Sequence, residues 1–336
     1  MFENAVAVFM VGALIIYALM GGADFGGGFW DFCARGPRAL RQREAIARAI
    51  GPIWEANHVW LILVIVLLFS GFPVGFAAIM TALNIPLTLM LFGIVLRGST
   101  FAFRKYDRDE EKIHRRWSVA FGTASVFTPL VQGMTLGALA TGRIRFAQGS
   151  LTSGYLAGWL TPFALACGIF ALALFAFLAA TYLTVDTIDA PDLQNDFRTR
   201  ALWSGGLLWP IAGIVFVLSK SGAPDMFRGL TNWWAPYLLG MTILLAIGCL
   251  LVLWQRHFLW ARAAAAGEVT LVLGGWSLAH YPHLIMPDLT LHDTAAPAAT
   301  LRLLLIALCA GAVLLLPSLF FLFRIFKGSQ IIEPKK

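Results

Sequence analysis

Two acidic side chains and a histidine lie in stretches of sequence that are otherwise almost entirely apolar. Asp24 lies in a glycine-rich stretch (residues 21–28), and Glu55 and His58 lie in the next apolar run. An ionised carboxyl in hydrocarbon costs about 2.5–3.5 kcal/mol on insertion scales, so acids in such runs are candidate functional groups. Glu55 and His58 are three residues apart, on one helix face, where they can hydrogen-bond or exchange a proton. These residue types indicate proton transfer inside a membrane.

The two acids are expected at one depth below the same membrane surface. Asp24 lies roughly eight residues before the first predicted helix ends, and Glu55 roughly six residues after the second begins. With a rise of about 1.5 Å per residue, both lie about 9–12 Å from that surface on neighbouring helices. The alternative is that each acid only hydrogen-bonds a neighbouring helix. For His58 alone, a structural hydrogen bond is the expected role.

Other polar residues have ordinary structural explanations. Arg97 ends the third predicted helix, where a long cation snorkels to water or lipid phosphate unless it has a specific role. Gln132 lies deeper in the fourth helix, and an interhelical hydrogen bond accounts for it. His280 and His283 with nearby acids could bind a metal, but two prolines and the lack of a third fixed ligand favour a rigid external cap at residues 280–293.

The glycine-rich stretch around Asp24 has the composition of a phosphate-binding loop but not its sequence. No Lys-Ser or Lys-Thr pair follows it, and it is embedded in an apolar run, which excludes nucleotide binding. Gly22 and Gly26 are instead spaced so that a second helix can approach closely.

The elements that carry these residues are expected to be transmembrane helices. Of the 336 residues, 59% are hydrophobic and 13% are charged, and the mean hydropathy is +0.77, which excludes an ordinary soluble domain. A span needs about 20 apolar residues. The sequence thus predicts an all-α, polytopic protein, a single membrane domain over residues 1–336 with about nine spans near residues 5–32, 49–70, 72–96, 117–140, 155–185, 201–219, 234–254, 263–280 and 301–326.

The net charge of +7 is explained by orientation in the membrane rather than by nucleic-acid binding. When the loops are assigned to alternate sides, one side holds only five of the 25 Lys and Arg residues: Arg143, Arg145, Lys220, Arg228 and Arg302. The richer side should be cytoplasmic, with the N-terminus outside and the C-terminus inside. Glu3 stands where a secretory signal would be basic, so the first helix is expected to be retained.

The cysteines show no paired spacing, which argues against disulfides and thiolate metal sites. We expect all four to be small core residues: Cys33, Cys167, Cys249 and Cys309.

Several blocks of the sequence closely resemble the second subunit of cytochrome bd-type quinol oxidases. In chain order they are residues 22–28, 50–61, 96–104, 160–165 and 275–282 with 287–290, so the resemblance covers essentially the whole chain. One departure is that Glu55-Ala56 replaces the Asp-Gly frequent in the family. The carboxyl is kept on a side chain that is one methylene longer.

The resemblance implies two four-helix bundles plus one peripheral helix, in a bacterial inner membrane, paired with subunit I. That subunit would carry two hemes b and heme d and oxidise quinol, and the complex would reduce dioxygen to water with cytoplasmic protons. The resemblance also implies that a structural quinone or a small single-helix subunit can be present. It matches Asp24 and Glu55 to carboxyls of the subunit interface and proton delivery. The matching motifs near that interface contain Trp54, Asn57, Trp60 and Arg97.

We expect no redox centre in this chain, since its six His form no bis-ligand arrangement at matching depth. Two other functions compete with the oxidase subunit. A proton-coupled secondary transporter would also place carboxyls in glycine-rich helices, although no internal repeat is evident. A passive assembly subunit would use its acids only to bond its partner.

Overall fold

The structure is a computed structural model that describes residues 2–51, 54–106, 111–147 and 149–332, with the side chains of 55, 104–106, 111–115, 316 and 322–332 left out of the description. The helices are α1 (Phe2–Cys33), α2 (Ala39–Ile50), α3 (Trp54–Gly71), α4 (Pro73–Ala82), α5 (Asn84–Tyr106), α6 (Glu111–Ala140), α7 (Pro162–Asp186), α8 (Pro191–Gly222), α9 (Pro224–Leu230), α10 (Ala235–Trp254), α11 (Phe258–His280), α12 (Leu291–Thr294) and α13 (Ala298–Ile332). Two short antiparallel pairs join β1 (Phe146–Ala147) to β2 (Ser150–Leu151) and β3 (His283–Ile285) to β4 (Leu289–Thr290).

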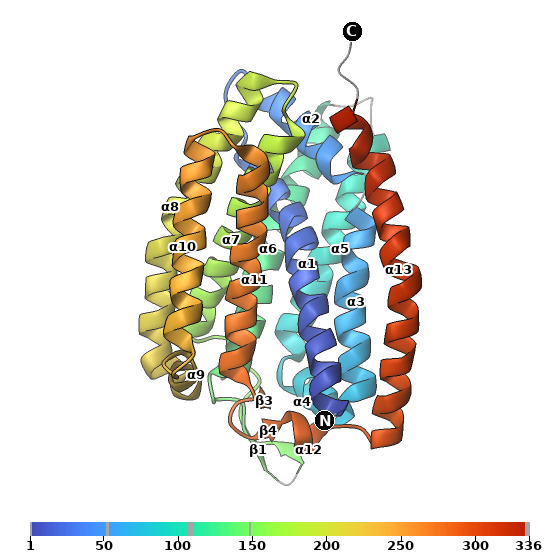
Figure 1. Cartoon of the computed structure of the whole chain (residues 1–336), viewed down its shortest axis with the longest axis vertical. Helices are drawn as coiled ribbons and strands as arrows, with labels where there is room; N and C mark the ends of the chain where they lie inside the picture. Colours follow the sequence, from blue (N-terminus) through green and yellow to red (C-terminus); the bar gives the residue numbers. More distant parts are fainter. Residues whose placement is uncertain (1, 52–53, 107–110, 148, 333–336) are drawn as a thin grey trace.

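The long helices run side by side along the long axis of the molecule (Figure 1). Helices α1, α3, α5 and α6 pack together, α7, α8, α10 and α11 form a second group, and α13 lies at the edge beside α1 and α3. The predicted all-α fold is confirmed. We call the end of the molecule that holds α2 the α2 end. The N-terminus, the four strands and α12 lie at the opposite end (Figure 1).

The number of membrane spans differs from the expected nine. In the described part of the chain, seven helices are long and apolar enough to cross a membrane, or up to eight if α3 and α4, which bend by 119° at their junction, count as one span. Helix α11 has the length, but Arg262 and Glu268 lower its hydropathy. The count of about nine is not confirmed.

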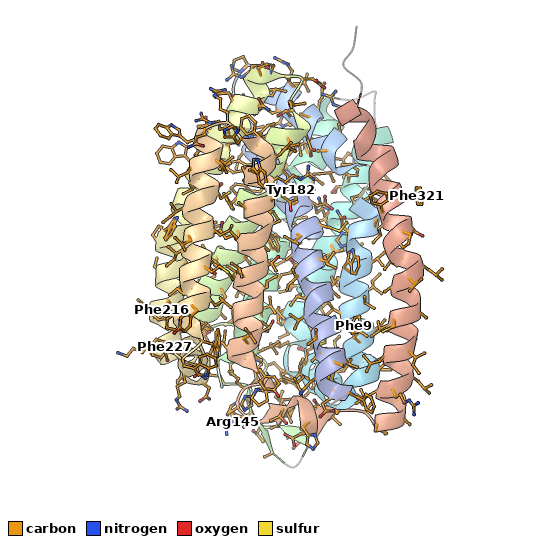
Figure 2. The ribbon with its side chains drawn as sticks, viewed as in Figure 1. Phe9, Arg145, Tyr182, Phe216, Phe227 and Phe321 are labelled. Atoms are coloured by element: carbon orange, nitrogen blue, oxygen red, sulfur yellow. The ribbon has the colours of Figure 1, made fainter. Side chains whose placement is uncertain are left out.

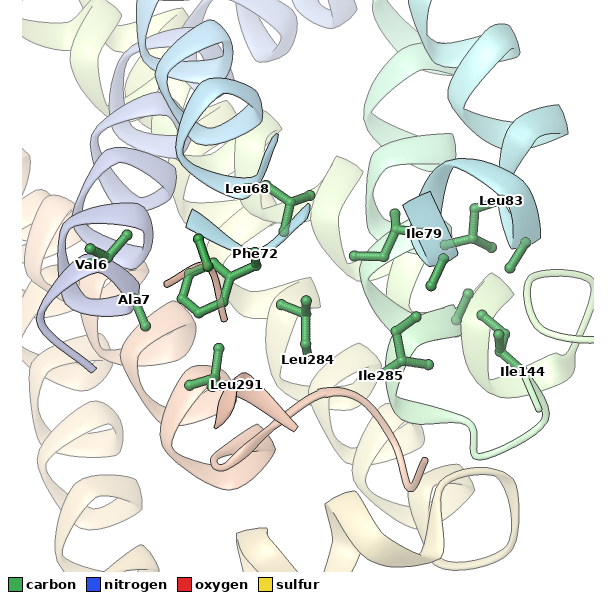
Figure 3. Close-up of a cluster of buried hydrophobic side chains, with 14 of the residues drawn as sticks. Val6, Ala7, Leu68, Phe72, Ile79, Leu83, Ile144, Leu284, Ile285 and Leu291 are labelled. Atoms are coloured by element: carbon green, nitrogen blue, oxygen red, sulfur yellow. The ribbon is translucent and has the colours of Figure 1, made fainter. Parts of the chain in front are cut away.

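The third predicted span, residues 72–96, begins where α4 begins, but it is divided at Leu83 and ends later than predicted, at Tyr106. Pro73 begins α4 and cannot donate the hydrogen bond that would continue α3, so the chain turns there. Phe72 and Leu83, at the two ends of α4, are fully buried with Leu284 and Ile285 from the opposite end of the chain (Figure 3). The following helix, α5, therefore begins later and continues to Tyr106.

Other boundaries also shift. The predicted span at 49–70 is α3, which is preceded by a separate α2, and the span at 201–219 is the longer α8. The span predicted at 155–185 begins at Pro162, because Thr161 caps α7 by accepting a hydrogen bond from the backbone N of Ala164 at 3.1 Å.

The close approach predicted at Gly22 and Gly26 is confirmed. A Cβ atom on Gly22 would lie 2.6 Å from the ring of Phe175, and one on Gly26 would lie 1.9 Å from the Phe175 backbone oxygen. These glycines let α1 pack directly on α7. Asp24 lies between the two glycines in the sequence, so this packing also fixes its position.

The prediction for the cysteines needs one correction. Cys249 is buried, and Cys33 and Cys167 are half-buried, but Cys309 is exposed. It lies on α13, the peripheral helix, whose apolar side chains cover little of the rest of the chain.

Candidate functional site

Asp24 and Asn57 meet between α1 and α3. Both are buried, at 3% and 0% exposure. The Asn57 Nδ2 donates a hydrogen bond to the Asp24 carboxylate and contacts the backbone oxygen of Met20 at 3.5 Å. Two residues from separate apolar runs are thus brought together by the packing of α3 on α1. The Asn57 amide thus gives the buried carboxyl a hydrogen-bond partner inside the protein.

Arg97 of α5 lies inside the protein beside Asp24. It is 2% exposed; its Nη2 donates to the Asp24 backbone oxygen at 2.9 Å and its Nε to Ser125 Oγ at 3.2 Å. The guanidinium carbon lies 4.8 Å from the centre of the Phe25 ring and 5.2 Å from that of Phe121. These partners replace water around the buried cation.

The snorkelling expected of Arg97 is therefore wrong. Helix α5 ends at Tyr106 rather than near Leu96, so Arg97 lies nine residues inside the helix. Asp24 lies nine residues before the end of α1 at Cys33. Both helices end at the α2 end, so the acid and the arginine share a depth of about 13 Å along their helices.

His58 lies among aromatic side chains. Its ring centre is 6.2 Å from that of Tyr17 and 6.1 Å from that of Phe25. The buried Nδ1 has no hydrogen-bond partner among the described residues, so the expected structural hydrogen bond is not found at this atom. The interhelical bond predicted for Gln132 is confirmed, because its Nε2 donates to the Tyr17 hydroxyl at 2.6 Å.

We call these residues of α1, α3, α5 and α6 the buried polar cluster: Tyr17, Asp24, Asn57, His58, Arg97, Ser125 and Gln132. It places an acid, a cation and an imidazole close together, with His58 half-buried and the other members buried. Such a set can hold a proton and pass it between neighbours.

The remaining residues of the matched motif have different surroundings. Glu55 is in the first turn of α3, and its side chain lies outside the described part of the structure, so its predicted proximity to Asp24 is not tested. Trp54 packs against Phe101 with ring centres 5.9 Å apart. Trp60 is 7% exposed and belongs to this chain's own core.

Three buried or paired groups were missed from the sequence. Glu268 of α11 is 8% exposed, and Asp186 at the end of α7 pairs with Arg262 of α11 at 3.6 Å. Glu268 lies inside the predicted span at 263–280, so the rule that singled out Asp24 would also have found it. Asp186 and Arg262 lie just beyond predicted spans, where charged residues are expected and do not indicate a functional site.

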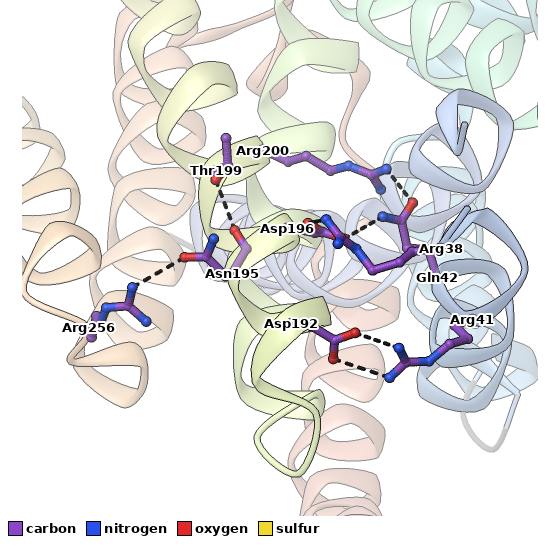
Figure 4. Close-up of polar contacts among 9 residues, drawn as sticks. All are labelled: Arg38, Arg41, Gln42, Asp192, Asn195, Asp196, Thr199, Arg200 and Arg256. Atoms are coloured by element: carbon purple, nitrogen blue, oxygen red, sulfur yellow. Dashed lines mark hydrogen bonds and ion pairs between the residues drawn. The ribbon is translucent and has the colours of Figure 1, made fainter. Parts of the chain in front are cut away.

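An ionic network closes the α2 end. Arg38 binds Asp196 of α8 through two hydrogen bonds of 2.8 and 2.7 Å, and Gln42 donates to the same carboxylate at 2.7 Å. Arg41 forms a second pair with Asp192 (Figure 4). These contacts hold the amphipathic α2 against α8, across the end of the molecule nearest to Asp24.

Residues 280–293, which were expected to form an external cap, fold at the end opposite to the α2 end, where Arg145 also lies (Figure 2). His280 and the Leu284 backbone oxygen are 3.2 Å apart, and Asp288 pairs with Arg145 at 3.1 Å. Across the described residues, no three His, Cys, Asp or Glu side chains form a group that could hold a metal ion.

Comparisons with known proteins point to one family. A family model described as "Cytochrome bd terminal oxidase subunit II" matches residues 2–326. The putative cytochrome bd menaquinol oxidase subunit II of Bacillus subtilis is 23% identical over 324 residues, which cover 94% of this chain and 92% of that protein. Cytochrome bd-I ubiquinol oxidase subunit 2 of Escherichia coli is 29% identical over 198 residues, which cover 57% and 50%. The fold is similar to a chain of the bd oxidase from Geobacillus thermodenitrificans, with a TM-score of 0.76, 22% identity, and coverage of 97% and 98%.

Proposed function

This chain belongs to the family of cytochrome bd terminal oxidase subunit II, and on that premise we propose that it supports subunit I in the reduction of dioxygen by quinol and helps to deliver protons to that reaction. The family and the apolar helices indicate a multi-pass protein of a bacterial inner membrane. The relatives' names include both menaquinol and ubiquinol oxidases, so quinol is the proposed class of electron donor. A proton-coupled transporter is not favoured.

We place the hemes in subunit I. In this chain, the rings of His58 and His280 are packed against its own aromatic side chains: Tyr17 and Phe25 for the first, and Trp276, at 4.8 Å, for the second. The His280 Nε2 also lies 3.2 Å from the Leu284 backbone oxygen, so that atom already has a partner. The hemes would supply electron transfer and oxygen reduction, and the residues of this chain would handle protons.

The observation that carries the proton role is the buried Asp24 with Asn57 and Arg97 around it. An acid at this depth is costly to bury, so it is a candidate functional group rather than an ordinary packing residue. Glu55, at the start of α3, is the proposed second carboxyl. We further propose that the α2 end faces the cytoplasm, because the basic loops expected there favour that side.

Purification of the native complex tests the oxidase role. The chain should co-purify with a heme-bearing subunit I, and the preparation should consume oxygen when quinol is supplied. A transporter would purify without heme absorption in the visible range. Isolation of this chain as an active, heme-free carrier would overturn the proposal.

A further inference from the structure

Two cavities lie next to each other near the α2 end. The inner cavity, of about 260 Å³, is bounded by α1, α2, α7 and α11 and is lined by Asp24, Ile50, Ala179 and Tyr182 among others. The outer cavity, of about 450 Å³, lies at the turns between α7 and α8 and between α10 and α11. Tyr182 lies toward the α2 end of the molecule (Figure 2).

The two cavities share two residues, Asp186 and Arg262. The Arg262 Nη1 lies 3.6 Å from Asp186 Oδ1, and the guanidinium carbon lies 4.6 Å from the centre of the Tyr182 ring. The side chain of Arg262 is 31% exposed and that of Asp186 is 13% exposed. Both residues of the ion pair thus line the cavity that includes polar groups of the α2 end and the cavity that reaches Asp24.

We propose that the two cavities form a water path from the α2 end to Asp24, and that the Arg262–Asp186 pair controls the passage of protons along it. The inference rests on the proposed role of Asp24 in proton delivery and adds the route and its control point. This route approaches Asp24 through α7 and α11, rather than through α3, which carries Glu55 and Asn57.

The volume and the lining both support water in the inner cavity. A water molecule takes about 30 Å³ of liquid, so a cavity of about 260 Å³ has room for several. Asp24, Tyr182, Asp186 and Arg262 supply the polar partners that an ordered water needs, among apolar residues such as Leu19 and Leu183.

The charges of Arg262 and Asp186 determine which substitution should slow the passage of protons and which should speed it. A guanidinium beside such a path repels an incoming proton, and the Asp186 carboxylate offsets that repulsion. Asp186→Asn should leave the positive charge in the path and slow proton delivery. Arg262→Gln should remove the barrier, and the double variant should recover the rate lost in Asp186→Asn.

Cysteine accessibility tests the path independently of turnover. In a complex from which the four native cysteines have been removed, Ala179→Cys places a thiol in the inner cavity. Ala180→Cys is the matched control, because Ala180 is equally buried on α7 but does not line the cavity. A small, positively charged methanethiosulfonate reagent applied at the α2 end should modify position 179 and not 180, and Arg262→Gln, which removes a like charge from its route, should speed the reaction by roughly tenfold.

Equal, slow labelling at positions 179 and 180 would overturn the water path and indicate that a lipid tail or collapsed side chains fill the cavity. If position 179 is labelled faster than position 180, but at a rate that Arg262→Gln does not change, the role of the ion pair as the control point is overturned. Turnover separates this inference from the proposed function. If Asp24→Asn stops oxygen consumption while Asp186→Asn leaves it unchanged at full heme content, the inference fails and the proposed function stands. If Asp24→Asn leaves it unchanged, the proposed proton role of Asp24 fails.

Discussion

The guanidinium of Arg97 lies inside the protein against the backbone of Asp24, with Nη2 at 2.9 Å from the carbonyl oxygen. Asn57 binds the carboxylate of the same residue. One residue of α1 is thereby joined to α3 through its side chain and to α5 through its backbone. The site is part of the packing of the first helix group, so removing a charge there has both structural and functional consequences.

Arg97→Gln should destabilise the assembled complex. The substitution removes the donor from the Asp24 carbonyl oxygen and from Ser125 Oγ, and a buried polar group that is left unpaired costs about 1–3 kcal/mol. Thermal unfolding of the purified complex measures the effect, and Arg302→Gln, a substitution of an exposed arginine on α13, is the control. Equal unfolding temperatures for the two variants would contradict the claim that Arg97 stabilises the packing around Asp24.

Gly26→Ala should separate α1 from α7. Its new Cβ would lie 1.9 Å from a backbone oxygen, which cannot move as a side-chain tip can, so a cost of about 1–3 kcal/mol or more is expected. Gly12→Ala in the same helix is the control, since nothing lies within 4 Å of its Cβ position. The yield of folded complex and its melting temperature should fall for position 26 only. Comparable values for both variants would refute the close-packing argument.

Orientation can be decided with single cysteines. In right-side-out vesicles, an impermeant thiol reagent should fail to modify Arg41→Cys and should modify Arg145→Cys, since the two lie at opposite ends and are similarly exposed, at 54% and 56%. Reaction at position 41 from outside would reverse the orientation and remove the cytoplasmic source of protons from the proposal.

The sequence predicted helix type and position better than it predicted helix ends. Apolar runs and the close approach at Gly22 and Gly26 follow from local chemistry, and both were predicted correctly. The division of residues 72–96 into α4 and α5 was missed because what holds α4 is distant: Leu284 and Ile285, more than 200 residues later, complete the apolar cluster against which it packs. A run of hydrophobic residues has the same appearance whether it forms one helix or two.

The candidate site was predicted in part for the same reason. Asp24 and His58 stand out as polar residues in apolar runs, but the partners of Asp24 depend on how helices pack. Arg97 was assigned to the surface because its helix was expected to end near Leu96. Glu268 could have been found by the rule already in use, whereas the pairing of Asp186 with Arg262 required the packing of α11 on α7.

The central claim is that the carboxyls at Asp24 and Glu55 deliver protons to the oxygen reaction in subunit I. Their amide substitutions, Asp24→Asn and Glu55→Gln, nearly preserve side-chain volume, and Asn at position 24 keeps an oxygen that can accept from Asn57. Asp225→Asn, a change at the opposite end, is the control for loss of a negative charge.

The most direct measurement is quinol-driven oxygen consumption by the purified variants at equal heme content. Loss of a positioned proton carrier predicts a decrease of about 100-fold or more for Asp24→Asn and Glu55→Gln, with an unchanged heme spectrum and with Asp225→Asn at the wild-type rate. Wild-type oxygen consumption and proton uptake by both variants, with full heme content, would contradict the proposal and leave these carboxyls a structural role.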